Sequence, residues 1–124
     1  NLQPDILKKL KLTSRLHFPV PTYSGKVQCI QDYIGKQPYL AAGDSPGDHS
    51  MLLHSQYKLW LARLEKPDYQ KQTAKLITDS NRNQWVIWPT RCKKTPGIIH
   101  DIEKIEALNS PAIAESLKIL KQLK

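Results

Sequence analysis

The sequence predicts an α/β fold with a mainly parallel, Rossmann-like sheet. Short apolar stretches with the length of strands alternate with stretches whose apolar residues lie three or four positions apart. This alternation is typical of βαβ units, which form parallel sheets. Beyond Pro96 and Gly97 the pattern becomes wholly helical. We therefore expect a core domain over residues 1–96 and a C-terminal helical extension over residues 97–124 that packs on it.

Each element of the core is predicted from its own residues. Strands are indicated by alternating or wholly apolar residues, and helices by the spacing of their apolar side chains. The stretch PYLAAGD (38–44) is almost wholly apolar, as expected of a strand with helices on both faces. Gly35 is a typical helix end, and Pro67 a typical first-turn residue. The expected elements are strand 10–18, helix 26–34, strand 38–44, helix 46–54, strand 57–63, helix 66–79 and strand 83–89.

Two apolar stripes predict helices in the C-terminal segment. Both stripes are expected to face the core, and a docking face for another chain is the alternative. The first stripe comprises Ile98, Ile102, Ile105 and Leu108, and the second comprises Ile113, Leu117 and Leu120 after Pro111.

Length and charge limit the class of protein. A chain of 124 residues has the size of one modest domain, since domains hold roughly 100–200 residues. The net charge of +8 is compatible with nucleic acid, an anionic membrane surface or phosphate-bearing substrates, but the lysines are scattered. We therefore favour a solvated basic surface and do not expect nucleic-acid binding.

The sequence contains no predicted membrane span. No apolar run reaches the ~18 residues that a spanning helix needs, and the first residues lack the pattern of a signal peptide. The compartment stays open: the protein could be soluble in the cytoplasm, or periplasmic or secreted if an upstream signal was removed.

Cysteine and histidine spacing does not predict a zinc site. Cys29 and Cys92 are isolated, so they are expected to be idle thiols, with one disulfide as the alternative. His49 and His54 are five positions apart, which does not place them on one helix face as a metal pair.

An acidic loop follows the apolar strand. In LAAGDSPGDHSML (40–52), Asp44 ends the strand and Asp48 lies four residues later. Ligands of open α/β sheets bind at the carboxyl ends of strands, and Mg²⁺ prefers carboxylate oxygens. The alternative is a capped turn at Asp44 or Ser45 without any metal. The spacing alone favours neither interpretation.

Lys26 favours an anionic ligand at this loop. It lies in SGKVQCI at the start of the helix that precedes the apolar strand, so its ammonium group could reach the same strand end. A lysine at a helix start opposes the helix dipole, which makes a specific anionic partner more plausible.

These residues carry a resemblance to a known family. The run VPTYSGKVQCIQDYIGKQPYLAAGDSPGDHSML resembles the third and fourth motifs of the haloacid-dehalogenase superfamily of phosphohydrolases: a lysine that opens a helix, then an apolar strand ending in GDxxxD. Within it, the run is most similar to the phosphoserine-phosphatase-like branch, which includes phosphorylcholine-phosphatase-like proteins. The resemblance is specific over residues 10–63, looser to Pro89 and absent beyond it.

The resemblance implies roles for four residues. Lys26 would neutralise negative charge on the nucleophile and on the transferring phosphoryl group. Asp44 would bind Mg²⁺, and Asp48 would brace the site or reach the metal through water. Ser45 would lie at the substrate. The implied reaction is hydrolysis of a small phosphomonoester through an aspartyl-phosphate.

The nucleophile of that reaction is not in the sequence. The family places it in a DxDx[TV] motif, and no DxD occurs in this chain; Asp101 and Glu103 lie in a segment of helical pattern. We therefore expect the C-terminal half of a phosphatase core, inactive alone, with the N-terminal half as its partner in the same or a separate chain. The alternatives are a degenerate half-domain and a non-catalytic basic module that binds phosphate-bearing partners.

Overall fold

The protein is a mixed α/β structure built on a four-stranded sheet. A computed structural model describes residues 14, 18–91, 97–98 and 110–123. The strand order is β1–β2–β3–β4. β1 and β2 are parallel, as are β2 and β3, whereas β4 pairs antiparallel with the end of β3. The strands are β1 (Leu40–Gly43), β2 (Tyr57–Arg63), β3 (Trp85–Arg91) and β4 (Gly97–Ile98).

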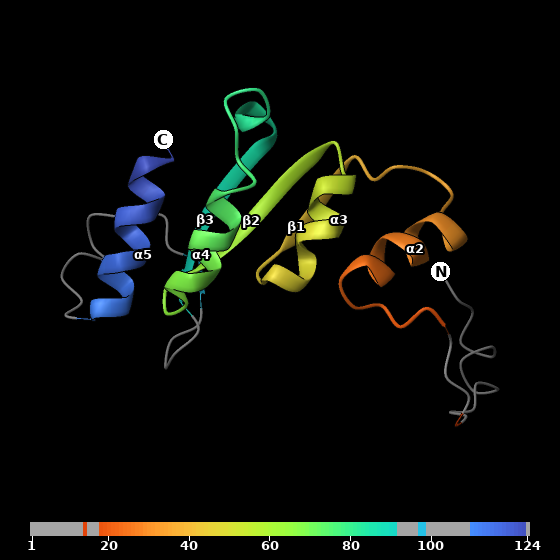
Figure 1. Cartoon of the computed structure of the whole chain (residues 1–124), viewed down its shortest axis with the longest axis horizontal. Helices are drawn as coiled ribbons and strands as arrows, with labels where there is room; N and C mark the ends of the chain where they lie inside the picture. The colour runs from red at the N-terminus through yellow and green to blue at the C-terminus, as the bar shows by residue number, and fades with distance from the viewer. Residues whose placement is uncertain (1–13, 15–17, 92–96, 99–109, 124) are drawn as a thin grey trace.

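Helices follow the strands in the alternation that the sequence predicts. Figure 1 shows α5, α4, α3 and α2 arranged in that order across the molecule. In the described part of the chain no helix is long and apolar enough to cross a membrane. The helices are α2 (Ser24–Tyr33), the 3-10 helix η1 (Pro46–Asp48), α3 (His49–His54), α4 (Pro67–Ala74), the 3-10 helix η2 (Arg82–Gln84) and α5 (Pro111–Gln122).

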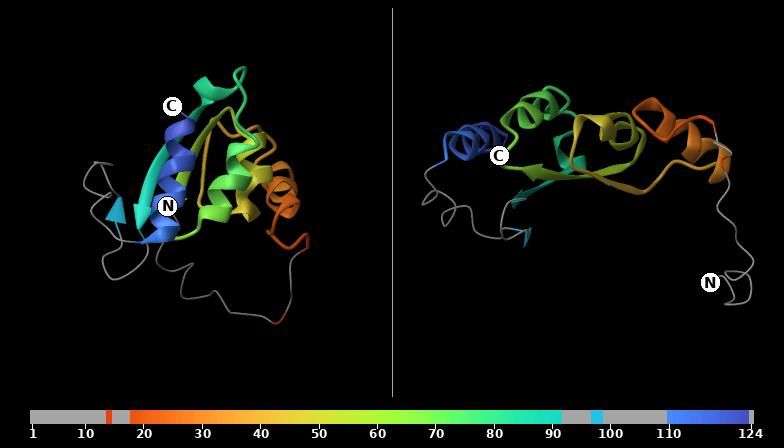
Figure 2. Two further views of the ribbon diagram at one scale, coloured as in Figure 1. Left: turned by 60° about the vertical axis from the view of Figure 1, so that its left-hand side comes forward. Right: turned by 90° about the horizontal axis from the view of Figure 1, so that it is seen from below.

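The helices gather on one face of the sheet, as the right-hand view of Figure 2 shows. Connections between parallel strands are almost always right-handed. Both crossovers, β1 to β2 and β2 to β3, advance in the same direction across the sheet, so right-handed connections place their helices on the same side. Burial in β2 agrees, because Lys58, Trp60 and Ala62 are buried while the residues between them are not.

The opposite face of the sheet is apolar and largely uncovered by the described residues. Leu40 is 55% exposed and Val86 is 58% exposed, and Ala42 is also exposed. The expectation that helices cover both faces of the 38–44 strand is therefore wrong for this part of the chain. The apolar composition of β1 does not indicate which segment would cover the second face of the strand.

The hydrophobic core lies between the sheet and helices α3, α4 and α5. Trp60 and Leu52 are its largest fully buried side chains. The second predicted stripe, on α5, faces this core, with Ile113, Leu117 and Leu120 buried. The hydroxyl of Ser116 also donates to the carbonyl of Leu64 at 2.8 Å. The apolar face of α5 is thus used within the chain, which contradicts its alternative role as a docking face.

Most predicted elements are confirmed, with shifted ends. The β2 strand has the predicted bounds. The predicted helix 46–54 is divided into η1 and α3. The predicted helix 66–79 ends at Ala74. The Asn81 side chain stabilises the turn that follows α4, because it accepts a hydrogen bond from the N–H of Thr78 and donates one to the carbonyl of Leu76.

Ile98, the first residue of the first predicted stripe, is not helical, and two predicted elements fall largely outside the described residues. Ile98 belongs to β4, where it pairs with Thr90; the rest of the first stripe is not described. Of the predicted strand 10–18 only Ser14 and Phe18 are described, and Phe18 is 74% exposed and outside any strand.

Candidate functional site

The acidic loop lies where β1 and β2 end. Gly43 is in register with Trp60, so β2 continues three residues further to Arg63, beside the loop. Because the two strands are parallel, their carboxyl ends lie at the same edge of the sheet. The N-terminal turn of α2 brings Lys26 to this edge. Four charged residues from three elements therefore meet at one place: Lys26, Asp44, Asp48 and Arg63.

Asp48 is the most buried of the four, with 6% of its surface exposed. One carboxylate oxygen, Oδ1, accepts a hydrogen bond from Lys26 Nζ in a short ion pair. The other, Oδ2, accepts from the backbone N–H groups of Asp44 (3.1 Å) and Ser45 (3.2 Å) and from the Ser45 hydroxyl (3.1 Å). Both oxygens are occupied, so Asp48 braces the loop and holds the lysine.

The contacts around Asp48 favour its ionised form. Burial alone would raise the pKa of this carboxyl, but the hydrogen bonds from Lys26, Asp44 and Ser45 outweigh burial and hold the pKa below its ordinary value. The carboxylate is therefore charged at neutral pH. Its charge also offsets the unfavourable position of Lys26 in the first turn of α2.

Gly43 permits the close approach of Asp48. A Cβ atom on Gly43 would lie 2.5 Å from the Cβ of Asp48, a distance that real Cβ contacts do not reach. The glycine before the first acid of GDxxxD is thus required by packing against the second acid.

Lys26 is positioned by a tight turn at the start of α2. The N–H of Gly25 donates to the carbonyl of Thr22 at 2.8 Å, and a Cβ on Gly25 would lie 2.1 Å from the carbonyl oxygen of Val20. Tyr23, which precedes the helix, has a φ of 46°, a strained region for a residue with a side chain. This turn directs Lys26 toward the acidic loop.

Asp44 is the accessible carboxylate of the site. Its side chain is 49% exposed, and its contact with Arg63 is long, 3.5 Å from Nη1 to Oδ2. Arg63 Nε is buried and has no hydrogen-bond partner in the part of the chain that the structure describes. Asp44 and Arg63 therefore retain hydrogen-bonding capacity for a ligand.

The residues present fit part of a Mg²⁺ site. Among the described residues no group of three or more His, Cys, Asp or Glu side chains could hold a metal ion. Mg²⁺, however, is commonly held by one or two carboxylates, with waters and substrate phosphate as the other ligands. Asp44 can supply one such carboxylate, whereas both oxygens of Asp48 already accept hydrogen bonds.

His49 has a packing role beside this site. The Thr73 hydroxyl donates to the carbonyl of Tyr69, so it accepts from His49 Nε2 at 3.0 Å. Burial lowers the pKa of His49, although the charge of Asp48 opposes part of this shift. A neutral imidazole with its proton on Nε2 therefore joins α3 to α4, consistent with the expectation that His49 does not pair with His54 as a metal site.

A cavity of about 460 Å³ opens next to the acidic loop. Lys26 and Ser45 line it together with residues from the turn before α2 and from α4. Ser45, predicted at the substrate, thus lies both at the cavity wall and in contact with Asp48.

Three residues at this edge were not predicted from the sequence: Arg63, Tyr23 and Tyr69. Arg63 ends the strand next to the acidic loop, so the shared edge of parallel strands was a usable signal. The two tyrosines come from a turn and a helix, and no spacing pattern connects them.

The sequence predicts that both cysteines are idle thiols. Cys29 is a free cysteine in the structure, and Cys92 lies outside the described residues.

Fold and site together define a mixed α/β protein with a three-stranded parallel array, compatible with a Rossmann-like fold, and an acidic loop at the end of its edge strand. No protein-family model, curated protein or solved structure matches the chain.

Proposed function

We propose that the chain supplies the lysine and the acidic loop of a Mg²⁺-dependent phosphomonoesterase of the haloacid-dehalogenase type, and that a further, N-terminal part of the protein supplies the nucleophilic aspartate. The observation that carries this proposal is the ion pair between Lys26 and the buried Asp48, which leaves Asp44 exposed beside it. A capped turn alone would not require a lysine from another helix.

The charges of the site suit a phosphoryl group. Lys26 and Arg63 lie at the same edge as Asp44, so cations for phosphate oxygens and a carboxylate for a metal are close together. Catalysis of phosphoryl transfer depends mainly on positioning and on stabilising negative charge. Mg²⁺, when bound at Asp44, would supply further stabilisation of that charge.

Each residue has a separate task in this proposal. Lys26 binds the phosphoryl group and neutralises its charge. Asp48 keeps Lys26 and the loop in place through its four hydrogen bonds. Asp44 holds the metal. Ser45 lies at the substrate.

The topology supports a missing part beside β1. In open α/β sheets the ligand site lies where the strand order reverses, at the carboxyl ends of the strands. The described sheet advances from β1 in one direction only, and β1 is its edge. Strands added at β1 in the other direction would make the acidic loop such a reversal point, and their right-handed connections would cover the exposed face near Leu40.

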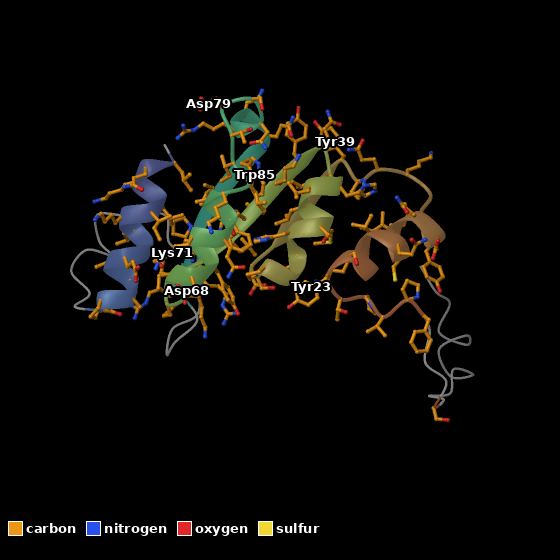
Figure 3. All side chains as sticks on the ribbon, viewed as in Figure 1. Tyr23, Tyr39, Asp68, Lys71, Asp79 and Trp85 are labelled. Carbon is orange, nitrogen blue, oxygen red and sulfur yellow. The ribbon has the colours of Figure 1, made fainter. Side chains whose placement is uncertain are left out.

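Substitution of the metal ligand tests the proposal in the natural full-length protein. Asp44→Asn should lower Mg²⁺-dependent hydrolysis of p-nitrophenyl phosphate by more than about 100-fold, because a neutral amide binds Mg²⁺ poorly. Asp79→Asn is the matched control. Asp79 is exposed and lies at the top of Figure 3, whereas Tyr23 lies toward the bottom. Equal activity of the Asp44→Asn variant and the control would contradict the proposal.

The rival function is a basic module that binds phosphate-bearing partners, which the net charge of +8 favours. That function predicts a salt-sensitive affinity for polyanions that Asp44→Asn leaves intact. The upstream sequence of the natural protein separates the two, since only the phosphatase requires a DxDx[TV] motif after an apolar strand.

A further inference from the structure

The cavity beside the acidic loop is larger than a phosphate ion needs. Its volume of about 460 Å³ falls in the range of roughly 300–1,000 Å³ that is typical of pockets for organic ligands. Lys26 and Ser45 line it, so a phosphoryl group held by the lysine would lie at its wall. The rest of the cavity is available for the organic part of the same molecule.

Flat side chains form much of the cavity. Tyr23 and Pro21 come from the turn before α2, Pro46 from η1, and Tyr69 from α4. Tyr23 is 65% exposed and directly precedes α2, with a backbone φ of 46°. Two tyrosine rings and two proline rings suit a flat or cyclic group better than a flexible chain. Thr22 and Gln72 add hydrogen-bonding groups.

The charge around the cavity disfavours a cationic ligand. Among its described lining residues, Lys26 is the only charged one. The guanidinium carbon of Arg63 lies 5.9 Å from the ring centroid of Tyr69, so its positive charge would repel a second cation near this ring. An ammonium group in the cavity would therefore find no carboxylate among its described lining residues.

We infer that the substrate is a phosphomonoester whose alcohol or phenol part is uncharged and carries a ring, which lies between Tyr23 and Tyr69. This inference rests on the proposed function and specifies its substrate class. Tyr23 is a specificity-determining residue through contact with that ring, whereas Lys26 binds the phosphoryl group.

Binding of three small esters to the natural full-length protein tests the inference. The probes are phenyl phosphate, glycerol 3-phosphate and ethanolamine phosphate, measured by calorimetry with EDTA present to prevent turnover. Phenyl phosphate should bind about tenfold more tightly than the other two, since ring contacts of this kind contribute modestly but measurably. Tyr23→Ala should remove this preference, and Tyr23→Phe should retain it.

Tyr39→Ala is the matched control, because Tyr39 is 69% exposed and lies near the top of Figure 3, whereas Tyr23 lies toward the bottom. Equal affinity for the three esters, or a preference that Tyr23→Ala leaves intact, would overturn the inference. Failure of the proposed function is distinguishable: none of the three esters would then be hydrolysed with Mg²⁺, whatever the order of their affinities.

Discussion

Asp44 and Asp48 are four positions apart in the sequence but have different surroundings in the structure. Asp48 is buried and hydrogen-bonded at both oxygens, while Asp44 is half exposed. The sequence left open whether the loop is a capped turn or a metal site. The structure shows that Asp48 and Ser45 form the turn and that Asp44 makes a long contact with Arg63. Spacing could not make this distinction, because it depends on which carboxylate Lys26 reaches.

The lowered pKa of Asp48 makes the stability of the protein depend on acid pH. Between its folded pKa and the ordinary value of 3.8, the unfolded chain binds a proton that the folded chain does not. The stabilisation is therefore complete above the ordinary value and is lost as pH falls through the folded pKa. We predict that Asp48→Asn lowers the free energy of unfolding by about 2 kcal/mol at pH 7.

Urea unfolding at pH 7, 5 and 3 checks this prediction. The difference in free energy of unfolding between the natural protein and Asp48→Asn should be similar at pH 7 and 5 and smaller at pH 3. A difference that stays constant down to pH 3 would show that the charge of Asp48 does not contribute.

Helix α4 is joined to β2 by a buried amide. Gln70 is fully buried; its Oε1 accepts from Trp60 Nε1 at 2.8 Å, and its Nε2 donates to the carbonyls of Arg63 (2.7 Å) and Lys66 (3.2 Å). Every hydrogen-bonding atom of the amide group is paired. This contact fixes α4, and with it Tyr69, against Arg63 at the strand end that carries the site.

Replacement of Gln70 should therefore destabilise the fold. Gln70→Leu leaves the buried Trp60 N–H without its partner, and we expect a loss of about 2–3 kcal/mol in the free energy of unfolding. Gln72→Leu, an exposed position on the same helix, should change it by less than about 0.5 kcal/mol. Urea denaturation followed by tryptophan fluorescence measures both. Equal effects of the two changes would contradict the role given to Gln70.

The elements with the clearest patterns were predicted best. YKLWLAR forms β2 with the expected bounds, and α5 buries the expected stripe. Ile98 belongs to a predicted helical stripe as regular as the one on α5, yet it lies in β4 and pairs with Thr90 of β3. The conformation of Ile98 follows from its pairing with β3, and the spacing of apolar residues in the sequence contains no signal for that pairing. Helix α2 is the opposite case: it forms as predicted but has no buried residue.

The whole molecule shows why the apolar strand was only partly understood from sequence. β1 lies at the edge of the sheet, with the helices on one face and exposed apolar residues on the other. An uncovered apolar edge and face promote aggregation. The composition of β1 correctly indicated a strand. It could not indicate that the described residues cover only one side, because that follows from the direction of the connections.

Mg²⁺-dependent hydrolysis of p-nitrophenyl phosphate, compared between the natural full-length protein and the isolated 124-residue polypeptide, tests the central claim most directly. The claim predicts activity in the natural protein and none in the isolated polypeptide, because Lys26, Asp44 and Asp48 cannot attack phosphorus without the upstream aspartate. Hydrolysis by the isolated polypeptide, or none by a natural protein that contains the DxDx[TV] motif, would contradict it.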